Sequence, residues 1–281
     1  MSNPERREFL RKAITLAGGI SVTRLVPGLF HSPTTALAAF AKFKLGIGTY
    51  TFRGLDVDTE LAHYQKLGIR YIELSSPSFF LDSLKEDAIE PYLEKLRRAG
   101  IELVSWFAGD IHNQAELDRT LRAAKLFGVK HVSGSAEGDV LLALDRAFQN
   151  DGLRFGIHNH WFADRKFIYQ SPESVLEALA KTSTAVGATL DTGHMIACGY
   201  DPTDAFLKLR ERVHIIHLKD DDVPGHNVVL GRGKANMAKF LSTIVKAEFS
   251  GLAAVEFEEG TDPFEEVRAC IEYAKARSEA A

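Results

Sequence analysis

The stretch Val186-Gly-Ala-Thr-Leu-Asp191-Thr-Gly-His194-Met195 joins a short apolar run directly to a carboxylate, a glycine and an imidazole. An apolar run that ends in such groups is typical of a buried β-strand that carries chemistry at its carboxyl end. The same design recurs in three other segments: Arg154-Phe-Gly-Ile-His158-Asn-His160-Trp161, Val213-His-Ile-Ile-His217-Leu-Lys219-Asp220 and Leu252-Ala-Ala-Val-Glu256-Phe-Glu258. We therefore expect four strands whose ends converge on one site.

Strand and helix patterns alternate along residues 39–281 with no break that would mark a second domain. Glycine follows three of the helical patterns directly, at Gly68, Gly100 and Gly128, as a stop signal does. About eight strand–helix units in roughly 250 residues predict an α/β fold, a (β/α)8 TIM barrel. A doubly wound open sheet is the alternative, but it usually has fewer units and a glycine-rich phosphate turn, which Gly46-x-Gly48 does not complete.

The expected elements follow from the apolar periodicity of each segment. The predicted strands are 43–52, 71–75, 101–107, 131–135, 155–160, 186–191, 214–219 and 253–258. The predicted helices are 58–67, 87–99, 115–127, 140–149, 172–182, 202–212, 235–248 and 263–277.

Successive residues of a strand point to opposite faces, one of which is the lumen in a barrel. On the last two strands the apolar set suits the side that packs on helices: Ile216, Leu218, Val255 and Phe257. The polar set is then expected at the lumen or its mouth: His217, Lys219, Glu256 and Glu258.

Four groups on successive strand ends are the candidate metal ligands: His158, Asp191, His217 and Glu256. A buried carboxylate or imidazole without a partner is costly, so these groups either pair with one another or bind a cation. A satisfied polar network explains any one of them alone. Four together favour a shared divalent metal.

With these motifs in view, the chain resembles the xylose-isomerase-like barrels of the sugar phosphate isomerase and epimerase superfamily, which includes tagatose 3-epimerase and inosose dehydratase. Leu190-Asp191-Thr192-x-His194-Met195 and Ile216-His217 are similar to the segments that carry the family's second and third metal ligands. Val255-Glu256-Phe257 is similar to the segment of the fourth. The resemblance runs from about Lys44 to Arg277 and implies a metal-dependent sugar enzyme.

The family's first ligand is commonly a glutamate on the fifth strand, and His158 stands at that position. In the epimerases two glutamates bind the metal and act as acid and base on opposite faces of the sugar, and here Glu256 alone remains of that pair. Imidazole is a good ligand, so metal binding is retained. The resemblance implies that Glu256 is the base, with His158 or His160 as the opposing acid–base group.

Six other residues are candidates for substrate binding: His194, Lys219, Arg232, Glu73, Trp106 and Trp161. His194 alternatively orients Asp191, and Lys219 alternatively neutralises Glu258. The remaining four have structural alternatives as well: an ordinary turn for the arginine, a buried salt bridge for the glutamate and core packing for the tryptophans.

The expected reaction is isomerisation or epimerisation of a carbohydrate or polyol through an enediolate beside a carbonyl. Loss of a leaving group from the same intermediate would instead make the protein a dehydratase or a keto-glycoside lyase, and the histidine at the first ligand position favours these outcomes. Two further hypotheses are a hydrolytic relative of the AP endonucleases and a non-catalytic sugar-binding barrel. A homodimer is left open.

Residues 1–38 resemble a twin-arginine export signal, with paired arginines at Arg6-Arg7, an apolar stretch and small residues at Ala36-Leu37-Ala38. Export to the periplasm follows from this resemblance. Because that route carries folded proteins, the site can be loaded before export, which favours Mn²⁺ over Zn²⁺, Co²⁺ or Fe²⁺.

Charge and composition limit the classes of partner that the chain is expected to bind. The chain carries a net charge of −4, and the part after the basic leader carries about −7. An acidic domain repels phosphate backbones, which argues against nucleic acid. No apolar run approaches the ~20 residues that span a bilayer, so no stable membrane span is expected after processing.

Overall fold

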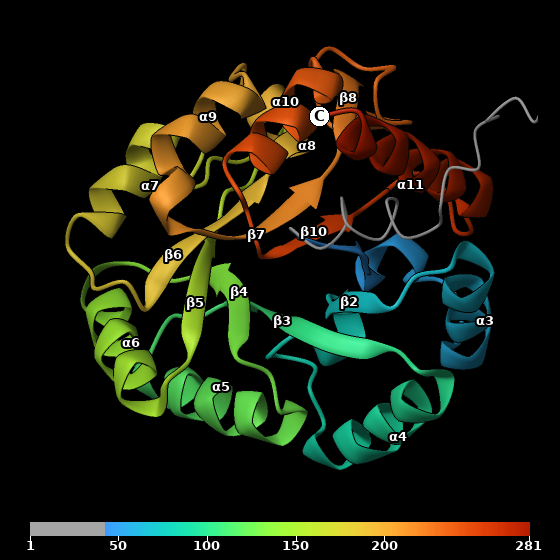
Figure 1. The fold of residues 1–281 in the computed structure, drawn as a ribbon. Helices are drawn as coiled ribbons and strands as arrows, with labels where there is room; N and C mark the ends of the chain where they lie inside the picture. The colour runs from blue at the N-terminus through green and yellow to red at the C-terminus, as the bar shows by residue number, and fades with distance from the viewer. Residues whose placement is uncertain (1–42) are drawn as a thin grey trace, which may run out of the picture. The chain divides into compact units, whose positions relative to one another are not determined.

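The computed structural model describes residues 43–281, and the predicted export signal at residues 1–38 lies outside this part of the chain. Eight parallel strands close into a barrel in the order β1-β10-β7-β6-β5-β4-β3-β2, with helices around it (Figure 1). The strands are β1 (Lys44–Gly48), β2 (Tyr71–Leu74), β3 (Glu102–Asp110), β4 (His131–Ser135), β5 (Arg154–His158), β6 (Val186–Asp191), β7 (Val213–Leu218) and β10 (Leu252–Val255). The predicted (β/α)8 TIM barrel is confirmed.

The outer layer consists of the helices that follow the strands. These are α3 (Val57–Leu67), α4 (Ile89–Ala99), α5 (Gln114–Phe127), α6 (Gly138–Asp151), α7 (Pro172–Leu179), α9 (Pro202–Leu209), α10 (Met237–Lys246) and α11 (Phe264–Glu279). Gly68 ends α3 in the left-handed conformation, with φ of 65°, which glycine adopts without steric cost. Gly100 and Gly128 end α4 and α5 in the same way, as their positions predicted.

Several short elements depart from the predicted pattern. Residues 49–52 form the 3₁₀ helix η1 (Thr49–Phe52) and do not extend β1, because the hydroxyls of Thr49 and Thr51 accept hydrogen bonds from the amides of Ser75 (2.8 Å) and Phe257 (3.2 Å). A short helix, α8 (Thr192–Ala197), follows β6, and a hairpin of β8 (Asp220–Val223) and β9 (His226–Val228) follows β7. Three other 3₁₀ turns are η2 (Pro77–Phe79), η3 (Glu86–Ala88) and η4 (Arg210–Arg212).

The apolar residues form two separate clusters, one on each side of the sheet. The large cluster between sheet and helices includes the four residues predicted to face the helices: Ile216, Leu218, Val255 and Phe257. A small cluster inside the barrel contains Ile215, Leu252 and Ala254, with Tyr71 and Val104 against it. His217 and Glu256 continue the alternation of this inner set toward the carboxyl ends of the strands, so the predicted division of faces is confirmed.

No helix within residues 43–281 combines the length and the apolarity that a membrane span requires.

Candidate metal centre and cavity

A polar layer fills the barrel above the small apolar cluster. Glu73 on β2 is fully buried and pairs with Nε2 of His217 on β7. The other Glu73 oxygen accepts hydrogen bonds from the hydroxyls of Ser105 (2.6 Å) and Ser133 (2.7 Å). Burial opposes ionisation of Glu73, but the facing imidazole and these hydrogen bonds outweigh it and lower its pKa. Because Nε2 of His217 is engaged, Nδ1 is the ring nitrogen left to bind a ligand.

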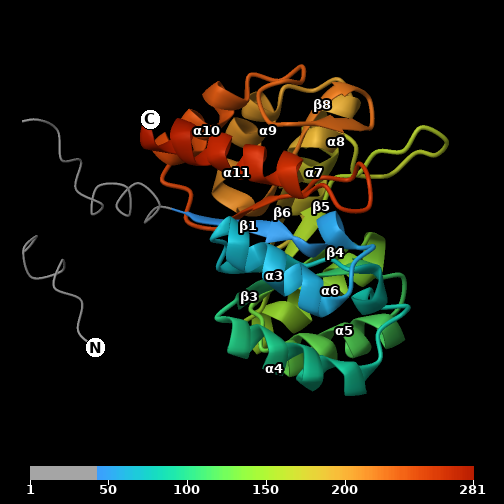
Figure 2. The same ribbon diagram turned by 90° about the vertical axis from the view of Figure 1, so that its right-hand side faces the viewer.

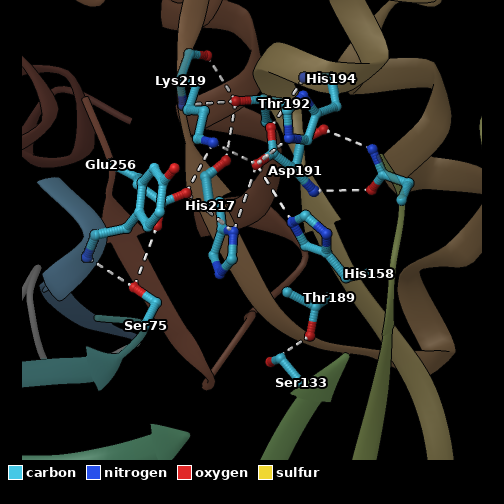
Figure 3. A network of polar contacts seen from close by, with 12 residues as sticks. Ser75, Ser133, His158, Thr189, Asp191, Thr192, His194, His217, Lys219 and Glu256 are labelled. Atoms are coloured by element: carbon cyan, nitrogen blue, oxygen red, sulfur yellow. Dashed lines mark hydrogen bonds and ion pairs between the residues drawn. The ribbon is translucent and has the colours of Figure 1, made fainter. Parts of the chain in front are cut away.

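Asp191 lies at the centre of the site, at the end of β6 (Figure 3). Its Oδ1 accepts a hydrogen bond of 2.9 Å from the amide of His194 and thereby caps α8. Its Oδ2 is 3.4 Å from Nδ1 of His217 and 3.5 Å from Nε2 of His158. Burial alone would raise the pKa of Asp191, but the nearby imidazoles and the ammonium of Lys219 outweigh it and hold the pKa well below its usual value.

Two side chains, neither predicted from the sequence, tie the strand ends together. The amide of Asn159 donates to the backbone oxygen of Asp191 (3.0 Å) and accepts from its N–H (2.9 Å), which joins β5 to β6. The hydroxyl of Thr192 donates to the backbone oxygen of Lys219 (2.6 Å) and accepts from its N–H (2.8 Å), which joins β6 to β7. Their position beside the candidate ligands was the signal that could have identified them.

Lys219 places an ammonium group among the carboxylates. Its Nζ is 3.0 Å from Oδ2 of Asp191 and 2.8 Å from Oε2 of Glu256, and it also pairs with Glu258. Burial would lower the pKa of Lys219, but these three carboxylates outweigh it and raise the pKa well above its usual value. Lys219 therefore neutralises Glu258, the alternative considered from the sequence, and it contacts two candidate metal ligands as well.

Glu256 follows β10 directly and reaches into the lumen beside β1. Its Oε1 accepts a hydrogen bond of 3.3 Å from the hydroxyl of Ser75, and its Oε2 is 3.5 Å from Nδ1 of His217. A Cβ atom at Gly48 would lie only 2.8 Å from Oε1 of Glu256. Glycine at position 48 therefore leaves the space that this carboxylate occupies.

The donor set fits a divalent metal. Two groups of potential ligands have their donor atoms within 4.8 Å of one another and share Asp191: His158 with Asp191 and His194, and Asp191 with His217 and Glu256. Three of these atoms are buried and make no hydrogen bond in the described structure: Nε2 of His158, Oδ2 of Asp191 and Nδ1 of His217. Buried polar atoms without hydrogen bonds are rare; the Lys219 ammonium lies 3.0 Å from Oδ2 of Asp191, whereas the two imidazole nitrogens have no such partner among the described residues, and a cation bound beside Asp191 would supply one. The four candidate ligands thus fall in two overlapping groups that share Asp191.

His160 lies beside this cluster and lines the cavity. Its ring stacks on that of His194, with 4.2 Å between centroids, and its Nδ1 is 3.2 Å from the backbone oxygen of Trp161. Since a carbonyl oxygen only accepts, Nδ1 carries the proton, and Nε2 of the neutral ring is an acceptor. Burial, assisted by the nearby Lys219 ammonium, lowers the pKa of His160 to about 3.

A cavity of about 320 Å³ opens above the cluster, at the carboxyl ends of the strands. His158, His160, His194, His217 and Glu256 all line it. Lys219 and Glu73 lie beneath this surface and act on the lining residues through their ion pairs with Glu256 and His217.

Three residues predicted to bind substrate lie away from the cavity. Trp106 is fully buried on the helix side of β3, where its indole N–H donates to the backbone oxygen of Phe79 at 2.8 Å. Trp161 packs against Gly225 in the hairpin, since a Cβ there would meet its ring at 2.4 Å. Arg232 is exposed in the loop after β9. The structure therefore corrects their predicted placement at the cavity.

A closed parallel barrel with imidazoles and carboxylates gathered at the carboxyl ends of its strands defines a TIM barrel with a candidate metal centre. Residues 61–276 match the family described as "Xylose isomerase-like TIM barrel". The chain belongs to this family, as the resemblance of its ligand segments implied.

Solved structures show the same fold. An L-ribulose 3-epimerase is 14% identical, with a TM-score of 0.67 over 85% of this chain and 95% of that one. The probable 3-DHS dehydratase AsbF of Bacillus anthracis is 16% identical, with a TM-score of 0.66 over 82% and 98%. The IOLI protein with a bound zinc atom is 18% identical, with a TM-score of 0.61 over 85% and 96%. No curated protein matches the chain in sequence.

Proposed function

We propose that the protein is a metal-dependent isomerase or epimerase of a carbohydrate or polyol, acting at a carbon next to a carbonyl. The observation that carries this proposal is that Asp191 links two groups of potential ligands, one with His158 and His194 and one with His217 and Glu256, and that all of these except Asp191 line an open cavity. The family and an epimerase among its structural neighbours support the reaction class.

His158 Nε2, Asp191 Oδ2, His217 Nδ1 and a carboxylate oxygen of Glu256 would hold the ion. A divalent metal bound there supplies Lewis acidity to adjacent carbonyl and hydroxyl oxygens of the substrate. We propose Mn²⁺, with Zn²⁺, Co²⁺ or Fe²⁺ as the alternatives; zinc is the ion in the related IOLI structure. Elemental analysis of protein exported in vivo tests this choice, and bound copper would contradict it.

Glu256 is the proposed base. Its carboxylate lines the cavity, and Ser75 and the space above Gly48 fix its position. On removal of the proton beside the carbonyl, an enediolate of the substrate forms. We propose His158 or His160 as the opposing acid–base group, since both rings line the same cavity.

The fate of the enediolate decides the product. Return of the proton to the other face gives an epimer, and return to the neighbouring carbon gives an isomer. Loss of a leaving group gives a dehydratase or keto-glycoside lyase reaction, which we keep as the second candidate because His158 stands where the family commonly has a glutamate. A dehydratase among the structural neighbours supports this alternative, and a non-catalytic sugar-binding barrel is the third.

Proton exchange tests the proposal directly. We expect the metal-loaded protein, incubated with a panel of keto-sugars in heavy water, to introduce deuterium beside the carbonyl of at least one of them. Glu256→Gln should abolish this exchange. Glu102→Gln removes an exposed carboxylate at the start of β3 and is the matched control. Undiminished exchange by Glu256→Gln would refute the assigned base.

We also propose that the protein is exported by the twin-arginine route and acts in the periplasm. The proposal rests on the paired arginines and the small residues near Ala38. Replacing Arg6 and Arg7 with lysine should retain the protein in the cytoplasm, as cell fractionation and immunoblotting would show. Export of this variant at the normal level would contradict it.

A further inference from the structure

The cavity extends outward beyond the four candidate ligands. Its volume of about 320 Å³ falls in the range of ~300–1,000 Å³ of pockets that enclose drug-sized ligands. The inner part is polar, with His158, His217 and Glu256 at its floor. The outer part is made of aromatic rings and carboxylates, among them Tyr50, Phe80 and Asp82.

An aromatic wall runs from the mouth of the cavity to its floor. The rings of Tyr50 and Phe80 are nearly parallel, at 7°, with centroids 6.3 Å apart. Phe80 meets Phe107 edge to face at 5.4 Å, and Phe107 meets the ring of His158 at 5.1 Å. All four rings line the cavity. A ligand anchored at the floor would therefore pass along an apolar surface on its way out.

The loop between β5 and α7 brings a second aromatic group to the same cavity. Phe162 and Phe167 stack on His160, with 4.7 and 4.6 Å between centroids. This loop, yellow-green in Figure 2, projects beyond the strands. The guanidinium of Arg165 lies over both phenyl rings, at 4.9 and 4.6 Å from their centroids. Phe162 is 44% exposed.

The charges around the cavity oppose a phosphorylated ligand. Asp82 and Asp110 line it, and neither carboxylate has a hydrogen bond or ion pair within residues 43–281. Glu256 and Glu258 line it as well but pair with the buried Lys219, whereas Arg165 is the one arginine or lysine among its described lining residues. A phosphate group would meet more carboxylates than cations. Sugar hydroxyls, in contrast, donate hydrogen bonds to free carboxylates, and the C–H faces of sugar rings pack on aromatic rings.

We infer that the substrate is a neutral keto-glycoside with a second ring attached to the reacting sugar, and that it carries no phosphate. The reacting sugar occupies the floor, an assignment that rests on the proposed function. The second ring, either another sugar or an aromatic aglycone, packs on Tyr50 and Phe80. Asp82 and Asp110 accept hydrogen bonds from its hydroxyls where it has them.

Binding of defined glycosides to the full-length, Mn²⁺-loaded protein tests the inference. Isothermal titration would compare glucose, methyl glucoside, phenyl glucoside, cellobiose and glucose 6-phosphate, together with the galactose series (galactose, methyl and phenyl galactoside, lactose and galactose 6-phosphate). Comparing only ligands that contain the same sugar removes affinity differences that arise from the stereochemistry of the sugar bound at the floor. In at least one series we expect the phenyl glycoside or the disaccharide to bind about tenfold more tightly than the methyl glycoside. The 6-phosphate should bind no more tightly than the free sugar.

Two variants assign the effect to the proposed surface. Phe80→Ala should bring Kd of the phenyl glycoside to that of the methyl glycoside and leave the latter unchanged. Leu126→Ala shortens an exposed apolar side chain on α5 and is the control. Asp82→Asn should weaken the disaccharide and spare the phenyl glycoside, which separates the two kinds of second ring. Thermal unfolding checks that each variant is folded.

The outcomes separate this inference from the proposed function. Equal affinity for methyl glycosides, phenyl glycosides and disaccharides in both series would overturn it, as would tighter binding of a 6-phosphate than of its free sugar. Proton exchange that occurs only with phosphorylated keto-sugars would overturn the inference and leave the proposed function standing. Tighter binding of the two-ring ligands without any proton exchange would support the inference and contradict the proposed function.

Discussion

Glu60 provides a test of how burial controls the stability of this barrel. It lies on α3 with 4% of its surface exposed, and the hydroxyl of Tyr64 is 3.5 Å from its carboxylate. Burial raises the pKa of Glu60 to about 8, more than the Tyr64 hydrogen bond lowers it. At neutral pH this side chain is therefore protonated in the folded protein and ionised in the unfolded chain.

A raised pKa in the folded state contributes stability at low pH that is lost as the pH rises toward that pKa. The loss begins near the ordinary value of 4.5 and is complete above about 8. Between pH 5 and 8 the linkage amounts to roughly 3–4 kcal/mol of unfolding free energy, at about 1.36 kcal/mol per unit. Glu60→Gln abolishes the titration, so the advantage of the variant over the wild type should grow by this amount across the same interval.

Urea unfolding at pH 5, 6, 7 and 8 measures the difference between the two proteins. Glu102→Gln, which removes an exposed carboxylate paired with Lys44, should show little change with pH. A difference between Glu60→Gln and the wild type that stays constant from pH 5 to 8 would refute the reasoning. It would mean that Glu60 ionises in the folded protein as readily as in the unfolded chain.

Three predictions concern the metal centre. Glu73→Gln should weaken metal binding by about 10–100-fold, measured by competition with a chelating dye, because the buried carboxylate orients the imidazole ligand; unchanged affinity would contradict this. Gly48→Ala should lower the rate of deuterium exchange while far-UV circular dichroism stays unchanged, since the new Cβ displaces the carboxylate of Glu256; full activity would show that the carboxylate tolerates displacement. Lys219→Met should lower the Tm of the metal-free protein and enlarge the rise in Tm on adding Mn²⁺, because the ammonium that competes with the metal for the oxygens of Asp191 and Glu256 is removed; an unaltered Mn²⁺ effect would argue against competition for those oxygens.

Much of the fold was predictable because the apolar periodicity of the segments and the glycines that follow the helices indicate the same element boundaries. The predicted strands 131–135 and 186–191 coincide with β4 and β6, and the residues predicted to face the helices on β7 and β10 do so. The convergence of the ligand segments was predictable for the same reason, since parallel strands of a barrel end at one rim. Side-chain hydrogen bonds that replace the strand ladder, as at Thr49 and Thr51, leave no such periodic signal.

The contact partners of particular side chains were harder to predict from the sequence. Trp106 stands between Ser105 and Phe107 on a strand buried on both faces, so alternation alone does not say which of them faces the lumen. Glu73 was a candidate for a hydroxyl contact or a buried salt bridge, and its partner is His217, 144 positions further along the chain. Asn159 was passed over because its task, bonding to the backbone of the next strand, depends on register and not on residue pattern.

The two oxygens of Asp191 have divided tasks, one as the cap of α8 and the other facing the candidate ligands. Truncating this residue to alanine would remove a helix start and a donor atom in a single step. Lost turnover in that variant would therefore leave open which of the two had been essential. Asparagine keeps an acceptor for the His194 amide while it discards the charge, which makes Asp191→Asn the more informative replacement in any survey of this centre.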